Sequence, residues 1–349
     1  MVTDTFASVR RAVIVVAAAS ALACSSWRQD LKPVAYQEFD CGTGESPSVE
    51  LRYLGSGGWF IRGPDDAILT APFFSNPSAL AVALSFAIPL QEDLDLIATG
   101  MRGVPKTASA ILVGHSHYDH LMEVPIIARH YARGDAKIYL NATGRNLLLD
   151  EEFGGRSVVV DGFAGSDSAA GAWLSPSPKA SIRFMALRSE HAPHLGPIKL
   201  FQGHVTKPNP NSRNAWDWRE GQTHAFIIDI MRDDKPVFRI HYQDSASNPK
   251  LGFPPDLGDD KRVDVAIVCM ASFGNVDGYP NELLTALKPR HVLVGHWESF
   301  FTKGELTSVP FTSTRDFAEA LTKALADPSL RGTTATTPYP GATLRYCVQ

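Results

Sequence analysis

The sequence has little cysteine, no surplus of basic residues and no apolar run long enough to cross a bilayer. Its four cysteines are too few for a disulfide scaffold, and no Cys-x-x-Cys pair indicates a zinc finger. Lysine and arginine number 33 against 37 aspartates and glutamates, so the chain lacks the positive field of most nucleic-acid binders. Apolar runs stay below the roughly 18–20 residues of a membrane span. With 349 residues, 44% of them hydrophobic, the composition predicts a large soluble domain and favours an enzyme.

The first 24 residues have the pattern of an export signal. Arg10 and Arg11 precede the short apolar run Ala12–Ala23, which is typical of a signal peptide rather than a membrane span. The run ends in Leu22-Ala23-Cys24, which resembles a bacterial lipobox, where the cysteine is lipidated and becomes the mature N-terminus. The alternative is plain secretion, with Cys24 an ordinary thiol. In both cases we expect a protein of the periplasm or bacterial cell envelope, held at a membrane only through a lipid on Cys24.

Residues 25–47 are polar and irregular and indicate a tether, and residues 48–349 predict one hydrolase domain. Predicted strands come in blocks separated by helices, with both hairpin-like and crossover spacing, which favours an α+β layered domain over a doubly wound sheet. The predicted strands are Val49–Leu54, Trp59–Ile61, Ala67–Leu69, Ala108–Val113, Lys137–Leu140, Ser157–Val160, Ile182–Leu187, Ala225–Met231, Val237–Tyr242, Val263–Val268 and His291–Val294. The predicted helices are Pro125–Arg133, Gly144–Phe153, Asn281–Leu287 and Thr314–Leu325.

The remaining cysteines have different expected roles. Export leads to an oxidising compartment, in which a disulfide between Cys41 and Cys347 would tie the two ends of the domain together. The alternative is that the two thiols stay separate. Cys269 lies in the apolar run Val263–Met270 and is expected to be buried and inert.

The segment Gly114–His120 carries the residues best suited to metal chemistry. It reads Gly-His-Ser-His-Tyr-Asp-His and directly follows a predicted strand. His115 and His117 share a side of an extended chain, because residues two apart point the same way. The chain then turns, so Asp119 and His120 approach from another direction. Imidazoles and a carboxylate clustered in this way suit a pair of borderline metal ions.

This segment, His115-x-His117-x-Asp119-His120, resembles the H-x-H-x-D-H signature of the metallo-β-lactamase superfamily. The resemblance covers most of the chain, from about Ser48 to about Thr302. It implies an αββα sandwich with a metal site at one edge, between the two sheets.

Two stretches match the family with departures. Gly55–Ile61 followed by Leu69–Phe73 resembles the opening hairpin, but Ala71 stands where the family usually has an aspartate that orients a ligand. His241–Ala246 resembles the element whose aspartate bridges two metals, with Gln243 in place of the usual glycine.

The resemblance also supplies the distant ligands. Ser189–His194 should provide the third histidine, which we assign to His191, with His194 as the competitor. Gly295-His296-Trp297 resembles the final strand-plus-histidine element. Carried over by position, site one is His115, His117 and His191, site two is Asp119, His120 and His296, and Asp244 bridges both.

The chemistry expected of this ligand set is hydrolysis. Two divalent ions lower the pKa of bound water from ~15.7 toward ~7 and stabilise a developing anion. Asp119 is placed to hold or accept the proton of that water, and His194 and Tyr118 are the candidates for a general acid. We expect two Zn²⁺ per chain, although Mn²⁺ or Fe suits the same ligands.

Tyr118, Phe73–Pro77 and His296-Trp297 resemble one branch of the superfamily. That branch contains N-acyl-phosphatidylethanolamine-hydrolysing phospholipase D and the ascorbate-6-phosphate lactonases. It implies a phosphodiester or phospholipid-like substrate. The alternatives are a lactonase or β-lactamase-type amide or ester hydrolase and, from another class, a surface module that binds metal without turnover.

Two insertions are expected to shape the pocket. Ser78–Met101 is apolar, and Pro197–Gly221 is a Pro/Asn-rich loop carrying Trp216 and Trp218. They predict a lid or lipid-facing groove; an ordinary packed helix and a surface loop are the alternative. The expected partner is therefore a small-molecule or lipid-derived substrate. Nucleic acid is disfavoured by export and by the absence of a basic stripe.

Overall fold

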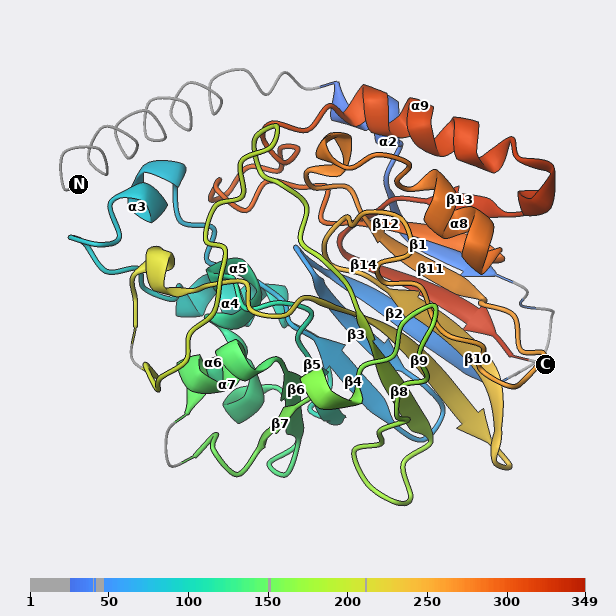
Figure 1. Cartoon of the computed structure of the whole chain (residues 1–349), viewed down its shortest axis with the longest axis horizontal. Coiled ribbons are helices and arrows are strands. Elements are labelled where there is room, and N and C mark those ends of the chain that lie inside the picture. The colour runs from blue at the N-terminus through green and yellow to red at the C-terminus, as the bar shows by residue number, and fades with distance from the viewer. Residues whose placement is uncertain (1–25, 40, 42–46, 150–151, 211, 349) are drawn as a thin grey trace.

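The computed structural model describes residues 26–39, 41, 47–149, 152–210 and 212–348. Two β-sheets lie against each other and carry helices on their outer sides (Figure 1). Cys24 and the rest of the expected export signal lie outside the described residues. Within the described ranges, no helix combines the length and the apolar character needed to cross a membrane.

The two sheets contain eight and six strands. The first sheet runs, in spatial order, β1 (Val34–Phe39), β14 (Pro338–Cys347), β2 (Ser48–Gly55), β3 (Gly58–Arg62), β4 (Ala67–Thr70), β5 (Ala108–Leu112), β6 (Lys137–Leu140) and β7 (Ser157–Val159). The second runs β13 (Thr334–Thr336), β12 (His291–Gly295), β11 (Val265–Cys269), β10 (Lys235–Tyr242), β9 (His224–Arg232) and β8 (Ile182–Arg188). The predicted α+β layered sandwich is confirmed.

Alternating residues of the strands pack on opposite faces of the first sheet. In β4, Ile68 joins the cluster that fills the space between the sheets, whereas Leu69 joins the cluster under the outer helices. In β5, Leu112 and Ile111 divide in the same way. This division follows from the two-residue period of a strand. It explains why these strands are apolar on both faces and are recognisable in the sequence.

Helices cover both outer faces of the sandwich (Figure 1). Those beside the first sheet are α3 (Ala79–Ala83), α4 (Leu94–Gly100), α5 (Tyr118–Leu121), α6 (Val124–His130) and α7 (Ala142–Leu148). Those beside the second are α2 (Trp27–Leu31), α8 (Asn281–Leu287) and α9 (Thr314–Leu325). Short 3₁₀ turns occur at Asp161–Phe163, Ala215–Asp217, Phe273–Asn275 and Pro328–Leu330.

The expected tether over residues 25–47 is corrected for residues 26–39, which fold as part of the domain. Trp27 is 3% exposed and packs on Trp297, with ring centroids 4.9 Å apart. β1 pairs in parallel with β14 at the edge of the first sheet. An edge strand is mostly exposed, so its sequence carries no continuous apolar pattern, and it is easily missed.

A disulfide joins Cys41 to Cys347, which are 306 positions apart in the sequence. The pairing of β1 with β14 brings the two cysteines together at the ends of neighbouring strands. The predicted disulfide is therefore confirmed, and the alternative of two separate thiols is wrong. Cys269 is a free, buried cysteine, and burial raises the pKa of its thiol, which fits the expected inert role.

Glu123 gives the fold a pH dependence. Its carboxylate is buried at the start of α6 and accepts hydrogen bonds from the backbone N–H groups of Phe74 and Ser75. Burial raises the pKa of Glu123 from 4.5 to about 7. Between about pH 4.5 and pH 7, Glu123 keeps a proton in the folded chain that it has released in the unfolded chain. The free energy of unfolding therefore falls as pH rises through this range. The difference between the two pKa values corresponds to a loss of roughly 3 kcal/mol in the free energy of unfolding.

We therefore expect Glu123→Gln to reduce the loss of stability between pH 5 and pH 8, because glutamine keeps an acceptor and has no proton to lose. Urea unfolding of the metal-free protein at both pH values measures this difference. Glu319→Gln, at an exposed position on α9, is the control and should keep the wild-type pH dependence. An unchanged pH dependence in Glu123→Gln would contradict the prediction.

Candidate metal centre

The predicted site residues follow the carboxyl ends of strands that meet at one edge of the sandwich. His115 to His120 follow β5 of the first sheet and lead into α5. In the second sheet β10, β11 and β12 are parallel, and β8 runs in the same direction because β9 is antiparallel to both of its neighbours. Consequently His191 after β8, Asp244 after β10 and His296 after β12 reach the same edge.

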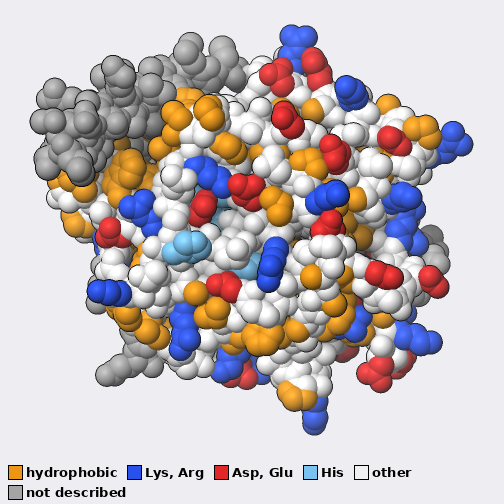
Figure 2. All heavy atoms as spheres, viewed as in Figure 1, with side chains coloured by type: hydrophobic (Ala, Val, Ile, Leu, Met, Phe, Trp, Pro, Cys, Tyr) orange, Lys and Arg blue, Asp and Glu red, His pale blue; other side chains and the backbone are white. Residues whose placement is uncertain are grey.

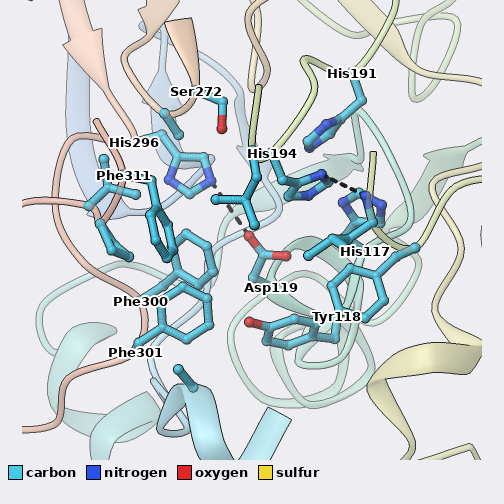
Figure 3. A pocket seen from close by; sticks show the side chains of 17 residues that line it. His117, Tyr118, Asp119, His191, His194, Ser272, His296, Phe300, Phe301 and Phe311 are labelled. Carbon is cyan, nitrogen blue, oxygen red and sulfur yellow. Dashed lines mark hydrogen bonds and ion pairs between the residues drawn. The ribbon is translucent and has the colours of Figure 1, made fainter. Parts of the chain in front are cut away.

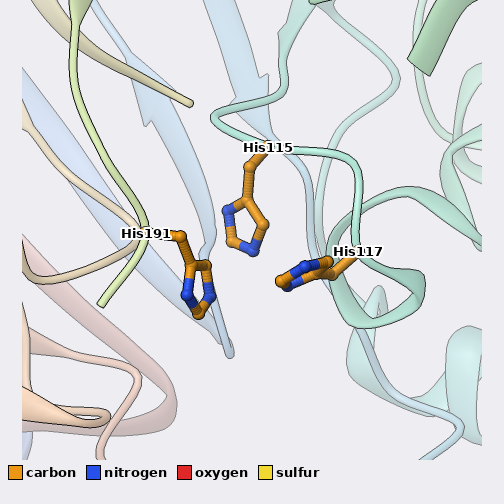
Figure 4. Close-up of side chains that lie close together, drawn as sticks. All are labelled: His115, His117 and His191. Atoms are coloured by element: carbon orange, nitrogen blue, oxygen red, sulfur yellow. The ribbon is translucent and has the colours of Figure 1, made fainter. Parts of the chain in front are cut away.

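The structure brings together all seven residues that the sequence nominates. In each of three groups, the potential ligand atoms lie within 4.8 Å of one another. The groups are His115, His117 and His191; His115, His120 and Asp244; and Asp119, His120 and His296. Figure 4 shows the three imidazoles of the first group turned toward a common point. His191 and not its competitor His194 belongs to these groups.

Asp244 lies between the two ends of the cluster. Its Oδ1 is 3.2 Å from Nδ1 of His115, and its Oδ2 is 3.4 Å from Nδ1 of His120. Asp119 connects the other end, with Oδ2 3.3 Å from Nε2 of His120 and 3.5 Å from Nε2 of His296. The potential metal-ligand atoms therefore form one continuous cluster from His191 to His296.

The charges in the cluster suit cation binding. Burial lowers the pKa of His115, His117 and His191, so these rings are neutral at neutral pH. Burial opposes the ionisation of Asp119 and Asp244, but the neighbouring histidines bring the pKa of both carboxyls below its usual value. Neutral imidazoles and ionised carboxylates are the forms that coordinate a metal.

Several buried nitrogen and oxygen atoms of the cluster, each able to bind a metal ion, have no hydrogen-bond partner. They are Nε2 of His115, Nε2 of His117, Nδ1 of His120, Nδ1 of His296 and Oδ2 of Asp244. Buried polar atoms in native proteins are almost always satisfied, because leaving one unpaired is costly. A cation held by these groups would satisfy such atoms where they face the other potential ligands, and mixed imidazole and carboxylate ligands suit zinc. The residues present therefore fit a metal centre.

Two glycines leave room for these ligands. A Cβ at Gly114 would overlap the carboxylate of Asp244, with only 2.5 Å to Cγ. A Cβ at Gly57 would lie 2.7 Å from Nδ1 of His120 and 2.9 Å from the hydroxyl of Tyr242. Both positions therefore need the smallest residue.

A short chain of hydrogen bonds that ends at the buried carboxylate of Glu298 supports the backbone of His296. Its backbone N–H donates to the Tyr53 hydroxyl at 2.8 Å, and that hydroxyl donates to Oε2 of Glu298 at 2.5 Å. Glu298 also accepts the backbone N–H of Ser56. His296 has a φ of 51°, in the left-handed region that few residues other than glycine adopt, and these hydrogen bonds stabilise it. Tyr53 and Glu298 are not among the residues predicted from the sequence, although a glutamate two positions after a predicted ligand is a usable signal.

An aromatic pocket opens beside the cluster (Figure 3). The cavity measures about 100 Å³ and contains His117, Asp119, His191 and His296 in its wall. The apolar part of the wall consists of Ala79, Leu195, Leu200, Phe201, Ala271, Phe300, Phe301, Val309, Pro310 and Phe311, and Tyr118, His194 and Ser272 complete it. Phe300, Phe301 and Phe311 are not among the residues predicted from the sequence, although they follow the last predicted ligand, His296.

Both insertions contribute to this region. The first supplies Ala79 to the wall and exposes Leu80, Phe86, Ile88 and Leu94, each more than 50% exposed. The second supplies Leu200 and Phe201, while Trp218 is buried and Trp216 packs on Phe201 with ring centroids 4.8 Å apart. The insertions are therefore part of the pocket rather than remote from it.

The chain resembles solved structures although no protein-family model and no curated protein matches it. Igni18, a metallo hydrolase from Ignicoccus hospitalis, aligns with 85% of this chain and 98% of its own, at 15% identity and a TM-score of 0.52. CmlA, a diiron β-hydroxylase from Streptomyces venezuelae, aligns over 87% and 55%, at 15% identity and 0.47. The metallo-β-lactamase fold protein YhfI from Bacillus subtilis aligns over 85% and 99%, at 12% identity and 0.44.

The chain has the metallo-β-lactamase fold. Its paired sheets, its outer helices and the likeness to Igni18 agree on this assignment. In this metallo-β-lactamase fold the histidine and aspartate cluster lies at the edge between the two sheets, as the sequence resemblance implies.

Proposed function

We propose that the protein is a metal-dependent hydrolase that cleaves a phosphodiester or phospholipid-like substrate. The single observation that carries this proposal is the cluster of seven buried histidine and aspartate ligands at the wall of an aromatic pocket. Such a cluster serves little purpose in a protein that only binds a partner through its surface. The open pocket gives a substrate access to the cluster.

We propose that two Zn²⁺ ions bind this cluster, with Mn²⁺ or Fe as alternatives. His115, His117 and His191 would hold one ion, Asp119, His120 and His296 the other, and Asp244 would contact both. When bound, such ions supply Lewis acidity and make water a better nucleophile at neutral pH. The three overlapping groups of potential ligand atoms, which extend from His191 to His296, support two ions rather than one.

The side chains of the chain contribute their own steps. Asp119 lines the pocket with an ionised carboxylate, so it can orient the attacking water and accept its proton. Phe300, Phe301 and Phe311 exclude bulk water and bind the apolar parts of the substrate. Exclusion of water strengthens each electrostatic contact at the reacting group.

The composition of the pocket wall favours a singly charged, apolar substrate. Among the described residues that line the pocket, none is lysine or arginine. A phosphate monoester carries two negative charges and usually needs such residues, whereas a diester carries one. The exposed apolar residues of the first insertion also suit a lipid. A neutral lactone fits the same wall, which makes a lactonase the second candidate.

We also propose that the protein acts in the periplasm or cell envelope, with a lipid on Cys24. The disulfide between Cys41 and Cys347 supports an oxidising compartment. On the face shown in Figure 2, lysines and arginines are interspersed with aspartates and glutamates. Such a mixed surface suits a small-molecule or lipid-derived substrate better than nucleic acid.

The test is hydrolysis by the Zn²⁺-loaded protein of bis-p-nitrophenyl phosphate, phosphatidylethanolamine in mixed micelles, an acyl lactone and a β-lactam. We expect turnover of the two phosphodiesters that a chelator abolishes and added Zn²⁺ restores. Turnover of the lactone or the β-lactam alone would reject the phosphodiesterase proposal. Full metal loading without turnover of any substrate would favour a metal-binding module.

A further inference from the structure

His194 lines the pocket without belonging to the ligand groups. Its ring stacks on that of His191, with centroids 4.6 Å apart and planes 17° apart, and its centroid lies 5.5 Å from that of His117. Figure 3 shows the ring among the pocket side chains, near His117 and Asp119. A substrate that reaches the cluster must therefore pass close to this ring.

Hydrogen bonds to a short turn fix both the backbone and the ring of His194. Its backbone N–H donates to the carbonyl of Ile198 at 2.9 Å. The backbone N–H of Leu200 donates to Nδ1 of the ring at 3.1 Å. An atom that accepts an N–H carries a lone pair and no proton, so Nδ1 is unprotonated.

The proton of the neutral ring is consequently on Nε2. Because Nδ1 carries no proton, the ring is not the doubly protonated cation and is therefore neutral. Among the residues that the structure describes, none forms a hydrogen bond with Nε2. The pocket therefore receives one fixed, uncharged N–H donor from this wall, where lysine and arginine are absent from the described lining.

We propose that His194 is a catalytic residue that donates the Nε2–H hydrogen bond to a non-bridging oxygen of the substrate. This inference rests on the proposed hydrolysis of a phosphodiester at the neighbouring cluster. The oxygen gains negative charge as water attacks, so the hydrogen bond strengthens toward the transition state. The ring transfers no proton: it is neither the general acid nor a metal ligand.

Two variants separate the donor from the bulk of the ring. The side-chain amide introduced by His194→Gln keeps an N–H group near the position of Nε2, whereas His194→Leu keeps only apolar volume. For bis-p-nitrophenyl phosphate we expect His194→Leu to lower kcat/KM by about 10²–10³-fold, as for other lost anion donors, and His194→Gln by at most about tenfold. Metal content should equal that of wild type in both variants. Loss of an ion from His194→Leu would make His194 a ligand and overturn the proposal.

A leaving-group series distinguishes a donor from a general acid. A general acid matters most when the leaving group is poor, whereas a donor to a non-bridging oxygen acts on all esters alike. We expect His194→Leu to lower the hydrolysis of p-nitrophenyl ethyl phosphate and phenyl ethyl phosphate by the same factor. A much larger loss with the phenyl ester would overturn the proposal in favour of a general acid.

Two readouts do not depend on turnover. ¹⁵N NMR of the metal-free protein should assign the proton of His194 to Nε2, and a proton on Nδ1 would overturn the proposal. Diphenyl phosphate should bind metal-loaded His194→Leu about tenfold more weakly than wild type in calorimetry, and equal affinity would overturn it. If wild type hydrolyses no phosphodiester, the proposed function fails, while these two measurements still decide whether His194 is an anion donor.

Discussion

His117→Ala is expected to bind about one metal ion fewer per chain than wild type and to hydrolyse bis-p-nitrophenyl phosphate at least ~10³-fold more slowly. His117 belongs only to the group with His115 and His191, so its loss should spare the other end of the cluster. His296→Ala removes a member of the group with Asp119 and His120 and should also lose one ion. Elemental analysis of both purified variants, together with their hydrolysis rates, measures these effects.

The two variants together test the number of ions. Two separate sites predict a loss of one ion from each variant, whereas a single shared ion predicts an empty centre in both. His130→Ala is the control, because His130 is an exposed histidine at the end of α6. It should keep full metal content and activity. Wild-type metal content and activity in His117→Ala would overturn the assignment of the site.

The sequence predicts the centre of this fold well because local pattern and tertiary structure agree there. The helices expected at Asn281–Leu287 and Thr314–Leu325 have the bounds of α8 and α9. Both carry apolar residues that pack into the hydrophobic core, and both end near residues that stop a helix. The expected helix Gly144–Phe153 is displaced: α7 begins at Ala142, because the side chain of Asn141 caps it by accepting the N–H of Gly144.

The site is predictable to the extent that its residues are close in the sequence or share a recognisable strand-end position. His115 to His120 form one local pattern, and the more distant ligands each follow a predicted strand. The supporting residues have no such pattern. Glu298 supports His296 through Tyr53, about 240 positions away, and only the folded chain brings them together. Likewise, exposed Phe311 is unremarkable as sequence and lines the pocket only because of the loop that carries it.

Gly114→Ala is the second variant expected to have a large effect, although Gly114 binds nothing through a side chain. Its new Cβ would overlap the carboxylate of Asp244, which must then rotate away from His115 and His120. The backbone leaves little freedom at this position, because the carbonyl of Gly114 accepts the N–H of His224. We expect reduced metal content and hydrolysis at least ~10²-fold slower, since Asp244 contacts both ends of the cluster.

Gly134→Ala is the matched control, because a Cβ at Gly134 meets no atom within 4 Å. It should equal wild type in metal content, activity and thermal unfolding. Circular dichroism should show that Gly114→Ala keeps its fold, since the overlap involves the end of a side chain rather than neighbouring backbone. If folded Gly114→Ala retained full metal content and activity, Asp244 could not be a ligand shared by two ions. The loss of metal and activity in Gly114→Ala therefore tests the placement of Asp244 while every proposed ligand stays unchanged. No substitution of Asp244 itself can do this.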